Sequence, residues 1–459
     1  MSAPTIHVRK DVWKLDASDR TLQWYAKAVE VMQARPATDP TSWAYQAAIH
    51  GTDADRPPSL SNSCMHGTWY FLSWHRMYVY RFEQIARAAV VEAGGPQEWA
   101  LPYWNYGIEG ESATLHPAFR QPTVDGRPNP LYVARRNPPV NDGVELPSQI
   151  TSAEQALARQ FFTGSTEFGG GITDADGRFF AETGQLEATP HNVIHVAVGG
   201  RSGWMSNPET AALDPIFWLH HANIDRLWAL WDSNGHKAPE DLRWIDQQFE
   251  LFDVDGNTVT QRCGDVTDTV EQLGYGYDGL PSRQPERRAE AQVSEGGEPE
   301  FVGASESAVV LTGRATEPVV VDVDQRAQQS FRRATGETSP RIQLSVENIE
   351  GEQNPGTIYA IYVHLPEDPS DEHYVGNLSF FGIERAMHPR GDEPGHGMRV
   401  AVDITDVARR MGVGSSEEAA RFAVTFRPIE VGSAGDTGSA RREALPEVTI
   451  GRISISYTA

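Results

Sequence analysis

Histidines gathered in two stretches of the chain constrain its fold more than any other feature of the sequence. Of the 14 histidines, one group is His50, His66 and His75, and a second group lies between residues 191 and 221. Buried imidazoles need partners. Metal ions would be such partners if the imidazoles of each set converged on one point. The sequence therefore predicts that these distant stretches meet in the fold.

The second group contains two histidines at helical spacing. His191 and His195 are four residues apart, which places both rings on one face of a helix, where they can reach the same metal. This spacing alone is equally typical of a surface or cap pair. Residues 214–226 read Asp-Pro-Ile-Phe-Trp-Leu-His-His-Ala-Asn-Ile-Asp-Arg and predict a buried apolar helix that supplies a third ligand.

The third ligand must be one of two adjacent histidines. His220 and His221 point about 100° apart on an α-helix, so we expect only one of them to face the metal. Asp225 lies four residues after His221, where its carboxylate could accept the proton of the ring nitrogen that does not bind metal. We therefore predict His221 as the ligand and Asp225 as the residue that orients it.

The histidines of the first group are spaced differently, but they can be interpreted as metal ligands in the same way. His50 ends a predicted helix over 40–50, His66 lies in a loop, and His75 opens a long apolar-periodic segment over 69–91. Three imidazoles without a carboxylate suit copper, zinc or iron, and the Irving–Williams order favours copper. Two triads predict a metal pair, which could share a two-electron reduction of dioxygen.

Length and charge narrow the class of protein. The chain has 459 residues, which predicts two domains, and a net charge of −24, which argues against nucleic acid or an anionic membrane as a partner. Two cysteines, no apolar leader and no stretch of about 18 apolar residues predict a soluble, cytoplasmic protein without a membrane span. Export on a partner protein would leave no such trace.

The patterning changes along the chain. Helical periodicity over 21–35, 40–50, 69–91 and 213–231 predicts a mainly α domain, a four-helix bundle with long loops, over residues 1–281. A polar, Pro- and Gly-containing stretch predicts a linker over 282–305. Strands of period two then predict an all-β sandwich over 306–459, interrupted by a helix at 405–411.

Several motifs resemble those of the type-3 copper proteins, the family of tyrosinases, catechol oxidases and molluscan haemocyanins. The matching segments are residues 66–83, 101–105, 214–228 and 273–277. The resemblance implies two copper ions with dioxygen as co-substrate, bound by His50, His66, His75, His191, His195 and His221. In that family the tyrosine motif at 273–277 meets an N-terminal arginine, for which Arg9 is the candidate.

The resemblance also implies the reaction. A tyrosinase or polyphenol oxidase oxidises small phenols and catechols to o-quinones. The alternatives are a catechol or o-aminophenol oxidase that does not hydroxylate monophenols, and an oxygen carrier of the haemocyanin type. A copper-delivery protein stays open as a partner, as does the oligomeric state.

The second half resembles the C-terminal domain of plant polyphenol oxidases at residues 374–380, 402–406 and 448–453. In those enzymes this domain covers the copper site and keeps the enzyme latent. The resemblance implies that the β domain of this chain shields the active site until it is displaced.

Further residues acquire roles from the resemblance. Cys64 is similar to the cysteine that forms a thioether with the copper-binding histidine, here His66, and its alternative is a small buried thiol. A phenol has a pKa of about 10 and must lose its proton to bind copper. Glu187 and Asn192 match a pair that holds a water for this purpose, and their alternatives are ordinary helix-start roles.

Two residues are predicted near the substrate entrance. Pro208 falls where plant catechol oxidases carry a bulky phenylalanine, so we expect a more open entrance. Phe217 lies four residues before His221, on the same helix face, and is either a ring packed between copper ligands or a plain core aromatic.

Overall fold

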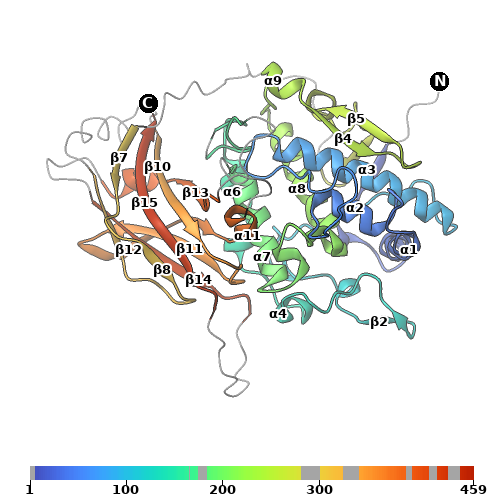
Figure 1. Cartoon of the computed structure of the whole chain (residues 1–459), viewed down its shortest axis with the longest axis horizontal. Helices are drawn as coiled ribbons and strands as arrows, with labels where there is room; N and C mark the ends of the chain where they lie inside the picture. The colour runs from blue at the N-terminus through green and yellow to red at the C-terminus, as the bar shows by residue number, and fades with distance from the viewer. Residues whose placement is uncertain are drawn as a thin grey trace.

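The computed structural model describes residues 6–164, 166–173, 183–280, 300–323, 341–388, 395–412, 421–432 and 445–458. Figure 1 shows two parts side by side. A helical part comprises residues up to 280, and a β part comprises residues from 300 onward. The predicted class, a mainly α region followed by an all-β region, is confirmed.

Four long helices form the centre of the helical part, close to their predicted bounds. They are α1 (Thr21–Ala34), α2 (Trp43–His50), α3 (Phe71–Glu92) and α8 (Pro215–Ser233). Their starts have local causes, since Ser42 caps α2 by accepting from the Tyr45 N–H, and Asp214 caps α8 by accepting from the Ile216 N–H. Pro215 occupies the first turn of α8, where no N–H is needed.

Shorter elements and long loops surround these helices. The helices are α4 (Pro138–Asn141), α5 (Ser148–Thr151), α6 (Glu154–Leu157), α7 (Val193–Gly199) and α9 (Leu242–Ile245), and a π-type turn η4 (Glu187–Asn192) precedes α7. The small strands are β1 (His7–Arg9), β2 (Thr123–Val124), β3 (Arg127–Pro128), β4 (Gln248–Phe252), β5 (Thr258–Arg262) and β6 (Tyr275–Tyr277).

The beginning and the end of the helical part are joined. β1 pairs with β6 in parallel, with Arg9 opposite Tyr277. The Nη1 of Arg9 donates to the Tyr277 hydroxyl at 2.7 Å, and the guanidinium lies 3.9 Å from the centre of the Tyr275 ring. The predicted meeting of Arg9 with the tyrosine motif is confirmed.

The β part is built on one antiparallel sheet. Its strands are β7 (Glu300–Ala304), β8 (Val309–Leu311), β9 (Val319–Val323), β10 (Arg341–Glu350), β11 (Ile358–Leu365), β12 (Asp368–Leu378), β13 (Met398–Asp403), β14 (Arg421–Ile429) and β15 (Val448–Thr458). Their order is β12-β11-β14-β9-β7-β15-β10-β13, with β8 also on β15. Gly376 of β12 lies against Val402 of β13, so the two ends of the sheet approach each other around one core.

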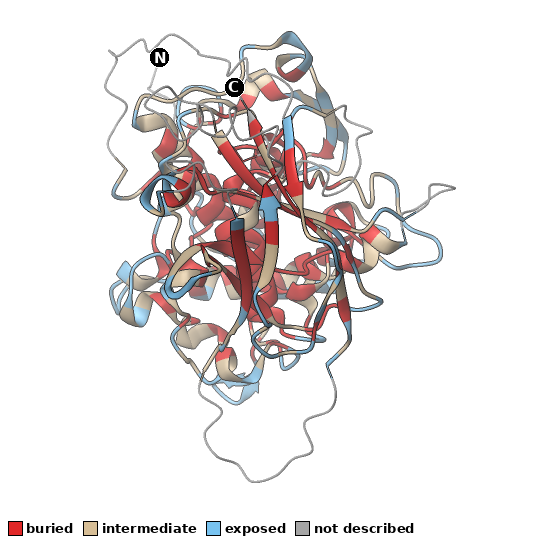
Figure 2. Cartoon of the chain, turned by 90° about the vertical axis from the view of Figure 1, so that its left-hand side faces the viewer, coloured by how far each residue is buried: buried red, intermediate tan, exposed pale blue. Residues whose placement is uncertain are grey.

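Two short helices interrupt the sheet. α11 (Ile383–Met387) follows β12, and α12 (Thr405–Arg410) follows β13 at the predicted position. Ile342, Leu344 and Val346 of β10 are completely buried, as the sequence indicates, but the intervening Gln343 and Ser345 are buried as well, so both faces of this strand are covered. Figure 2 shows this buried core running along the strands.

The predicted linker requires one correction. Residues 282–299 lie outside the described residues, but residues 300–304 form β7, which pairs with β15 and β9. The β part therefore starts before residue 306, because Val302 is an apolar core residue inside a stretch that otherwise reads as polar.

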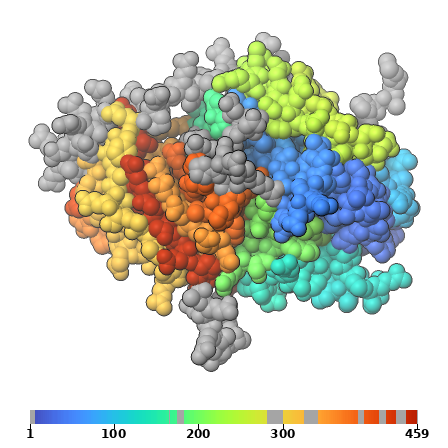
Figure 3. Space-filling model, in the orientation of Figure 1, coloured from blue at the N-terminus to red at the C-terminus, as the bar shows by residue number. Residues whose placement is uncertain are grey.

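The two parts pack directly against each other. In Figure 1 α11 lies beside α7, and in Figure 3 the surfaces of the two parts meet. Arg159 pairs with Asp403 at 2.7 Å, and Arg341 pairs with Glu167. The Nδ2 of Asn354 donates to the Ser206 carbonyl at 3.1 Å. Within the described residues, no helix is long and apolar enough to cross a bilayer.

Candidate metal centre

The predicted ligands come from five separate places in the chain. His50 is the last residue of α2, His66 lies in the loop before α3, and His75 lies in the first turns of α3. His191 lies in η4, and His195 lies in α7. Because η4 runs directly into α7, these two histidines share one place, and the fifth place is α8, which supplies both His220 and His221. All seven imidazoles are buried in the interior of the helical part.

The first three histidines form one compact group. The ring centres are 5.2 Å apart for His50 and His66, 5.0 Å apart for His66 and His75, and 5.6 Å apart for His50 and His75. These spacings are short enough for three imidazoles to face one ion. The first predicted triad is therefore brought together.

The second group lies directly beside the first. The ring centre of His191 is 4.6 Å from that of His195 and 4.9 Å from that of His221. The rings of His75 and His221 are stacked at 4.6 Å, with 11° between their planes, and His66 lies 5.6 Å from His191. The imidazole rings of the two triads thus lie directly against one another, which is the arrangement that a metal pair requires.

Hydrogen bonds fix how several of these rings are turned. The Nδ1 atoms of His50, His75 and His195 bond to the carbonyls of Pro208, Phe71 and Met205, at 2.9, 2.8 and 2.8 Å. The opposite Nε2 atoms of His50, His75 and His191 are buried without a hydrogen-bond partner among the described residues. Buried polar atoms without partners are rare, so these nitrogens fit metal ligation.

The protonation state of the imidazoles also fits. Burial lowers the pKa of His50 to about 3, and burial together with neighbouring imidazoles lowers the pKa values of His75, His191, His195 and His221 well below the usual range. The rings are neutral at physiological pH, which is the form that binds metals. The buried imidazoles therefore offer uncharged nitrogen donors.

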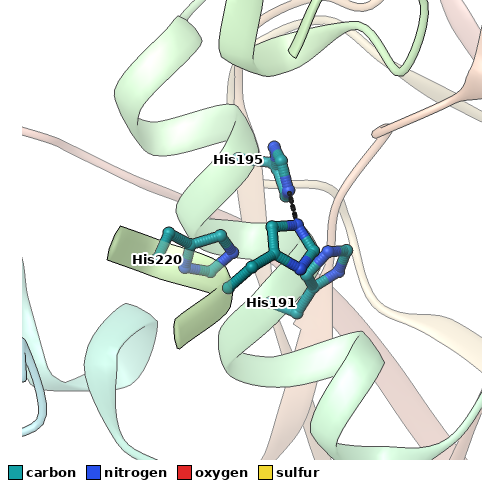
Figure 4. A group of neighbouring side chains, drawn as sticks. His191, His195 and His220 are labelled. Atoms are coloured by element: carbon teal, nitrogen blue, oxygen red, sulfur yellow. Dashed lines mark hydrogen bonds between the residues drawn. The ribbon is translucent and has the colours of Figure 1, made fainter. Parts of the chain in front are cut away.

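His220 lies closer to the second triad than the helical spacing predicts. Its ring nitrogen is within 4.8 Å of the corresponding atoms of His191, His195 and His221, and Figure 4 shows the three labelled rings around one point. His221 differs in two respects: its Nε2 is 3.4 Å from that of His195, and it also belongs to the group of His50 and His75. His220 instead shares its Nδ1 with the hydroxyl of Tyr106 at 3.1 Å.

The predicted role of Asp225 is wrong. Its carboxylate accepts from Arg76, from Arg9 at 3.0 Å, and from the hydroxyls of Tyr275 and Tyr277, rather than from His221. The Nδ1 of His221 has no hydrogen-bond partner in the described part of the chain. Two buried guanidinium groups compete more strongly for a carboxylate than a neutral imidazole does, so Asp225 joins α8 to α3 and β1 instead.

Glu187 and Asn192 both lie at the centre. Both carboxylate oxygens of Glu187 accept from the Gly67 N–H, at 2.8 and 3.0 Å, which joins η4 to the loop that carries His66. The Oδ1 of Asn192 lies 2.8 Å from the Nδ1 of His191 and orients that ring. Burial raises the pKa of Glu187 well above its usual value, although the Gly67 N–H lowers it in part.

Cys64 is a buried thiol beside the first triad, and the Nη1 of Arg385 donates to its Sγ at 3.7 Å. Its Sγ and the ring nitrogens of His50 and His66 all lie within 4.8 Å of one another. Cys263, in contrast, is buried away from the metal ligands, where its thiol donates to the Ser73 hydroxyl at 3.2 Å, and burial raises its pKa to about 12.

Pro208 and Phe217 are both buried, so neither lines an open entrance in this structure. Pro208 acts through its carbonyl on His50. The Phe217 ring lies 4.2 Å from that of His221, 4.9 Å from His50 and 5.8 Å from His195. It is thus packed between histidines of both groups.

One residue at the centre comes from the β part and was not predicted. The ring of Phe381 stacks on His195 at 4.1 Å with 18° between the planes, and it lies 5.6 Å from His66 and 5.8 Å from His191. Only a weak signal was present in the sequence, since two large aromatic residues, Phe380 and Phe381, stand side by side just beyond the end of β12.

Both parts of the chain match known protein families. Residues 40–234 match the family described as the common central domain of tyrosinase, and residues 298–458 match a domain family of unknown function. The chain is 34% identical to a tyrosinase, HcTyr1, of Hahella sp. (strain CCB-MM4), over 97% of this chain and 98% of that protein. It is 27% identical to a chloroplastic polyphenol oxidase of Malus domestica, over 77% of this chain and 65% of that enzyme.

Solved structures share the fold over the whole length. A latent apple tyrosinase superimposes with a TM-score of 0.63 at 21% identity, over 100% of this chain and 98% of that chain. A latent aurone synthase gives a TM-score of 0.62 at 20% identity, over 100% and 90% of the two chains. Both the helical part and the β part are included in these superpositions.

Proposed function

Because this chain belongs to the tyrosinase family and is a copper oxidoreductase, we propose that its buried histidines hold the two coppers at which it oxidises phenols and catechols to o-quinones. The observation that supports these assignments most directly is the convergence of neutral imidazoles from five chain segments. We assign His50, His66 and His75 to one copper, and His191, His195 and His221 to the other.

His221 is preferred to His220 as the last ligand for a geometric reason. His221 belongs both to the group of His50 and His75 and to the group of His191 and His195, so it lies between the two sites. His220 has its Nδ1 shared with Tyr106. We assign His220 a packing role, since its ring lies stacked 5.3 Å from His191.

When bound, the two coppers supply the electron transfer between dioxygen and the phenol. The protein holds and orients the reactants. Carbonyls of Pro208, Phe71 and Met205 fix three of the rings in place, and the completely buried Phe217 packs between the triads and excludes water.

Glu187 is the proposed acceptor of the phenolic proton. In the metal-free protein burial raises the pKa of Glu187, but nearby copper charge favours the carboxylate and reverses this effect. Its bond to the Gly67 N–H holds it next to the loop that carries His66. Asn192 serves by fixing the ring of His191.

The β part is proposed to keep the enzyme latent. The Phe381 ring covers His195 and approaches both triads, so a phenol cannot stack there while the β part is in place. This arrangement supports a resting form from which the β part must be displaced. The division into a catalytic domain of residues 1–281 and a shielding β domain follows from it.

A thioether between Cys64 and His66 is also proposed. The two side chains are close enough that a small movement would bring them into bonding distance. The new carbon–sulfur bond replaces the thiol S–H and one ring C–H of His66, and dioxygen, the co-substrate, is the oxidant that takes up the two hydrogens. The intact protein would then be lighter by two hydrogens, and peptide mapping would find no free thiol at Cys64. A cytoplasmic location and a small phenolic substrate, as predicted from the sequence, belong to the same proposal.

Oxygen uptake tests the proposed function. The copper-loaded protein is assayed with a monophenol, a catechol and an o-aminophenol, before and after cleavage in residues 282–299. We expect catechol turnover that rises after cleavage, together with slower monophenol turnover. Oxygen binding without turnover of any substrate would instead identify an oxygen carrier, and unchanged rates after cleavage would contradict latency.

A further inference from the structure

One short segment of the helical part orients a histidine of each triad. The Met205 carbonyl lies 2.8 Å from the Nδ1 of His195, and the Pro208 carbonyl lies 2.9 Å from the Nδ1 of His50. Both carbonyls belong to residues 205–209, which we call the bridging segment. A displacement of this segment would therefore turn one ring of each triad.

Close packing places the bridging segment between two helices. A Cβ added at Gly199 of α7 would meet the backbone nitrogen of Ser206, and a Cβ added at Gly51, directly after α2, would meet the Pro208 carbonyl. Glycine permits such a close approach of two backbones. The segment thus fits directly against the helices that carry the two histidines.

The β part holds the bridging segment through Asn354. The Nδ2 of Asn354 donates to the Ser206 carbonyl at 3.1 Å, between the two carbonyls that bond to histidines. Asn354 is itself buried and fixed, because its N–H donates to Glu384 at 2.8 Å and its Oδ1 accepts from the Gly356 N–H at 2.9 Å. These bonds keep the side-chain amide in the orientation that places its donor on Ser206.

A second contact joins the β part to the end of the bridging segment. The Nη1 of Arg385 lies 4.0 Å from the Glu209 carboxylate, and the two side chains are only 15% and 16% exposed. The β part therefore contacts the bridging segment both before and after Pro208.

We propose that Asn354 is a positioning residue for the metal ligands, which holds the bridging segment where its carbonyls turn His195 and His50 toward the metals. This inference rests on the proposed function for the assignment of these two histidines as ligands. Groups that orient a ligand through its other ring nitrogen contribute to metal affinity. Docking of the β part thus stabilises the ligand geometry of both sites.

Asn354→Asp removes the donor alone. The carboxylate has the shape of the amide and keeps an oxygen for the Gly356 N–H, but it cannot donate to the Ser206 carbonyl. The turn that carries residue 354 should therefore stay in place, while the bridging segment loses its bond to the β part.

Ring signals of the metal-free protein report where the carbonyls lie. A carbonyl can only accept, so each neutral ring carries its proton on Nδ1. In full-length Asn354→Asp with isotope-labelled histidine, the Nδ1–H signals of His195 and His50 should shift upfield, because their hydrogen bonds lengthen. The signal of His75, which bonds to the Phe71 carbonyl within α3, should keep its wild-type position.

Two outcomes of this measurement would overturn the inference. One is that the signals of His195 and His50 stay where they are in the wild type. The other is that the signal of His75 shifts as much as theirs, since that would indicate a general change of the helical part.

Copper affinity gives a second readout. In competition with a chelator, Asn354→Asp should bind copper about tenfold more weakly than the wild type, the lower end of the loss that such orienting groups cause. Asp403→Asn is the matched control, since it weakens docking of the β part at Arg159, away from the bridging segment. It should keep the wild-type affinity, and an equal loss in both variants would overturn the inference.

Asn354→Ser covers the case in which Asn354→Asp does not fold. It brings no charge next to Glu384, and its hydroxyl can still accept from the Gly356 N–H. The serine side chain is one bond shorter and does not reach the Ser206 carbonyl. The same shifts and the same loss of copper affinity are expected, and their absence would overturn the inference.

Catechol distinguishes this inference from the proposed function. Wild-type protein cut within residues 282–299 that binds two coppers and oxidises catechol, with histidine signals that do not respond to Asn354→Asp, would overturn the inference alone. Wild-type protein that binds no copper pair and does not oxidise catechol would overturn both.

Discussion

At the residue scale, the histidines could be identified from sequence and their neighbours only in part. Ligands are recognisable because one metal demands several imidazoles at close spacing, as His191 and His195 show. The partners of Asp225 were not recognisable, since Arg9 and Arg76 reach it from elements distant in sequence. A four-residue spacing places two side chains on one helix face. It does not determine whether a third group from elsewhere in the chain binds one of them instead.

His195→Ala tests the ligand assignment. Removal of one of three imidazoles from the second triad should lower copper content from two ions to about one per chain and abolish catechol turnover. Metal analysis and oxygen uptake measure the two effects. His388→Ala, an exposed histidine of the β part, is the control and should keep both coppers. Full copper with wild-type turnover in His195→Ala would disprove the assignment.

Glu187→Gln separates proton transfer from electron transfer. The amide oxygen can still accept from the Gly67 N–H, so the loop of His66 should stay in place. Loss of a general base costs about 10²- to 10⁴-fold, and this loss should fall on monophenol hydroxylation, with catechol oxidation much less affected. Equal losses on both substrates would indicate a structural role for Glu187.

Asp225→Asn tests the buried charge network. Burial raises the pKa of Asp225, but the ion pairs with Arg76 and Arg9 and the tyrosine hydrogen bonds outweigh it, so the pKa lies below the usual value. Its carboxylate therefore stabilises the fold above about pH 4, and this contribution is lost as the pH falls through the lowered pKa. The variant leaves two cations without their shared partner, at a cost of about 3–5 kcal/mol.

Thermal unfolding measures this effect. Asp225→Asn should have a lower Tm than the wild type at pH 7 and a smaller fall in Tm between about pH 5 and pH 3. Asp246→Asn removes one partner of an exposed ion pair with Arg262, and such pairs contribute little. An equal loss of Tm in both variants would argue against a special role for the buried network.

At the scale of elements, the long helices and the β strands follow from periodicity, while the segment before α7 does not. His191 and His195 share one continuous helix, but the chain bends just before it, because Thr189 has extended backbone and Pro190 follows it. The bend brings Glu187 to Gly67. Local patterns do not predict such a junction, since it depends on a contact with a loop 120 residues earlier.

The segment between β12 and α11, which carries Phe381, shows the same limit. Strand patterning predicts where β12 lies, but Phe380 and Phe381 follow its last residue, so the pattern does not determine which of them points outward. Which cavity receives that ring depends on how the two parts dock. That docking rests on polar pairs such as Arg159 with Asp403, whose members are 244 residues apart.

Asp403→Asn tests that pair. Burial raises the pKa of Asp403, but Arg159 and Thr405 outweigh it, so Asp403 is ionised at neutral pH. The variant keeps an oxygen that can accept from the Thr405 N–H at the start of α12, and loses the charge that faces Arg159. Loss of about 1.4 kcal/mol from the closed form would raise the catechol activity of the uncut protein about tenfold.

The control for this variant is an ion pair within the sheet. Glu372→Gln removes the partner of Arg427, at 2.6 Å, without touching the helical part. It should leave the activity of the uncut protein at the wild-type level. If both variants raise activity alike, general loosening of the β part, rather than its docking, would be responsible.

At the scale of the whole molecule, composition and patterning suffice to predict a helical part followed by an all-β part. The bounds are less predictable, because residues 300–304 join the sheet although their surroundings in sequence are polar. The relation between the parts is a property of the assembled fold. It places the ring of Phe381 from the β part on His195 of the helical part, and under the proposed latency the activity would depend on how often the two parts separate.

The pairing of β1 with β6 bears on what happens during such a separation. Any outward motion of the β part pulls on the chain beyond Tyr277, where backbone bonds to β1 and the hydroxyl bond to Arg9 hold it. The pairing of β1 with β6 would bear this force before it reaches α8 and the metal ligands. If the β part is displaced as proposed, the pairing of β1 with β6 would keep the pull of the connecting chain from changing the positions of the buried imidazoles.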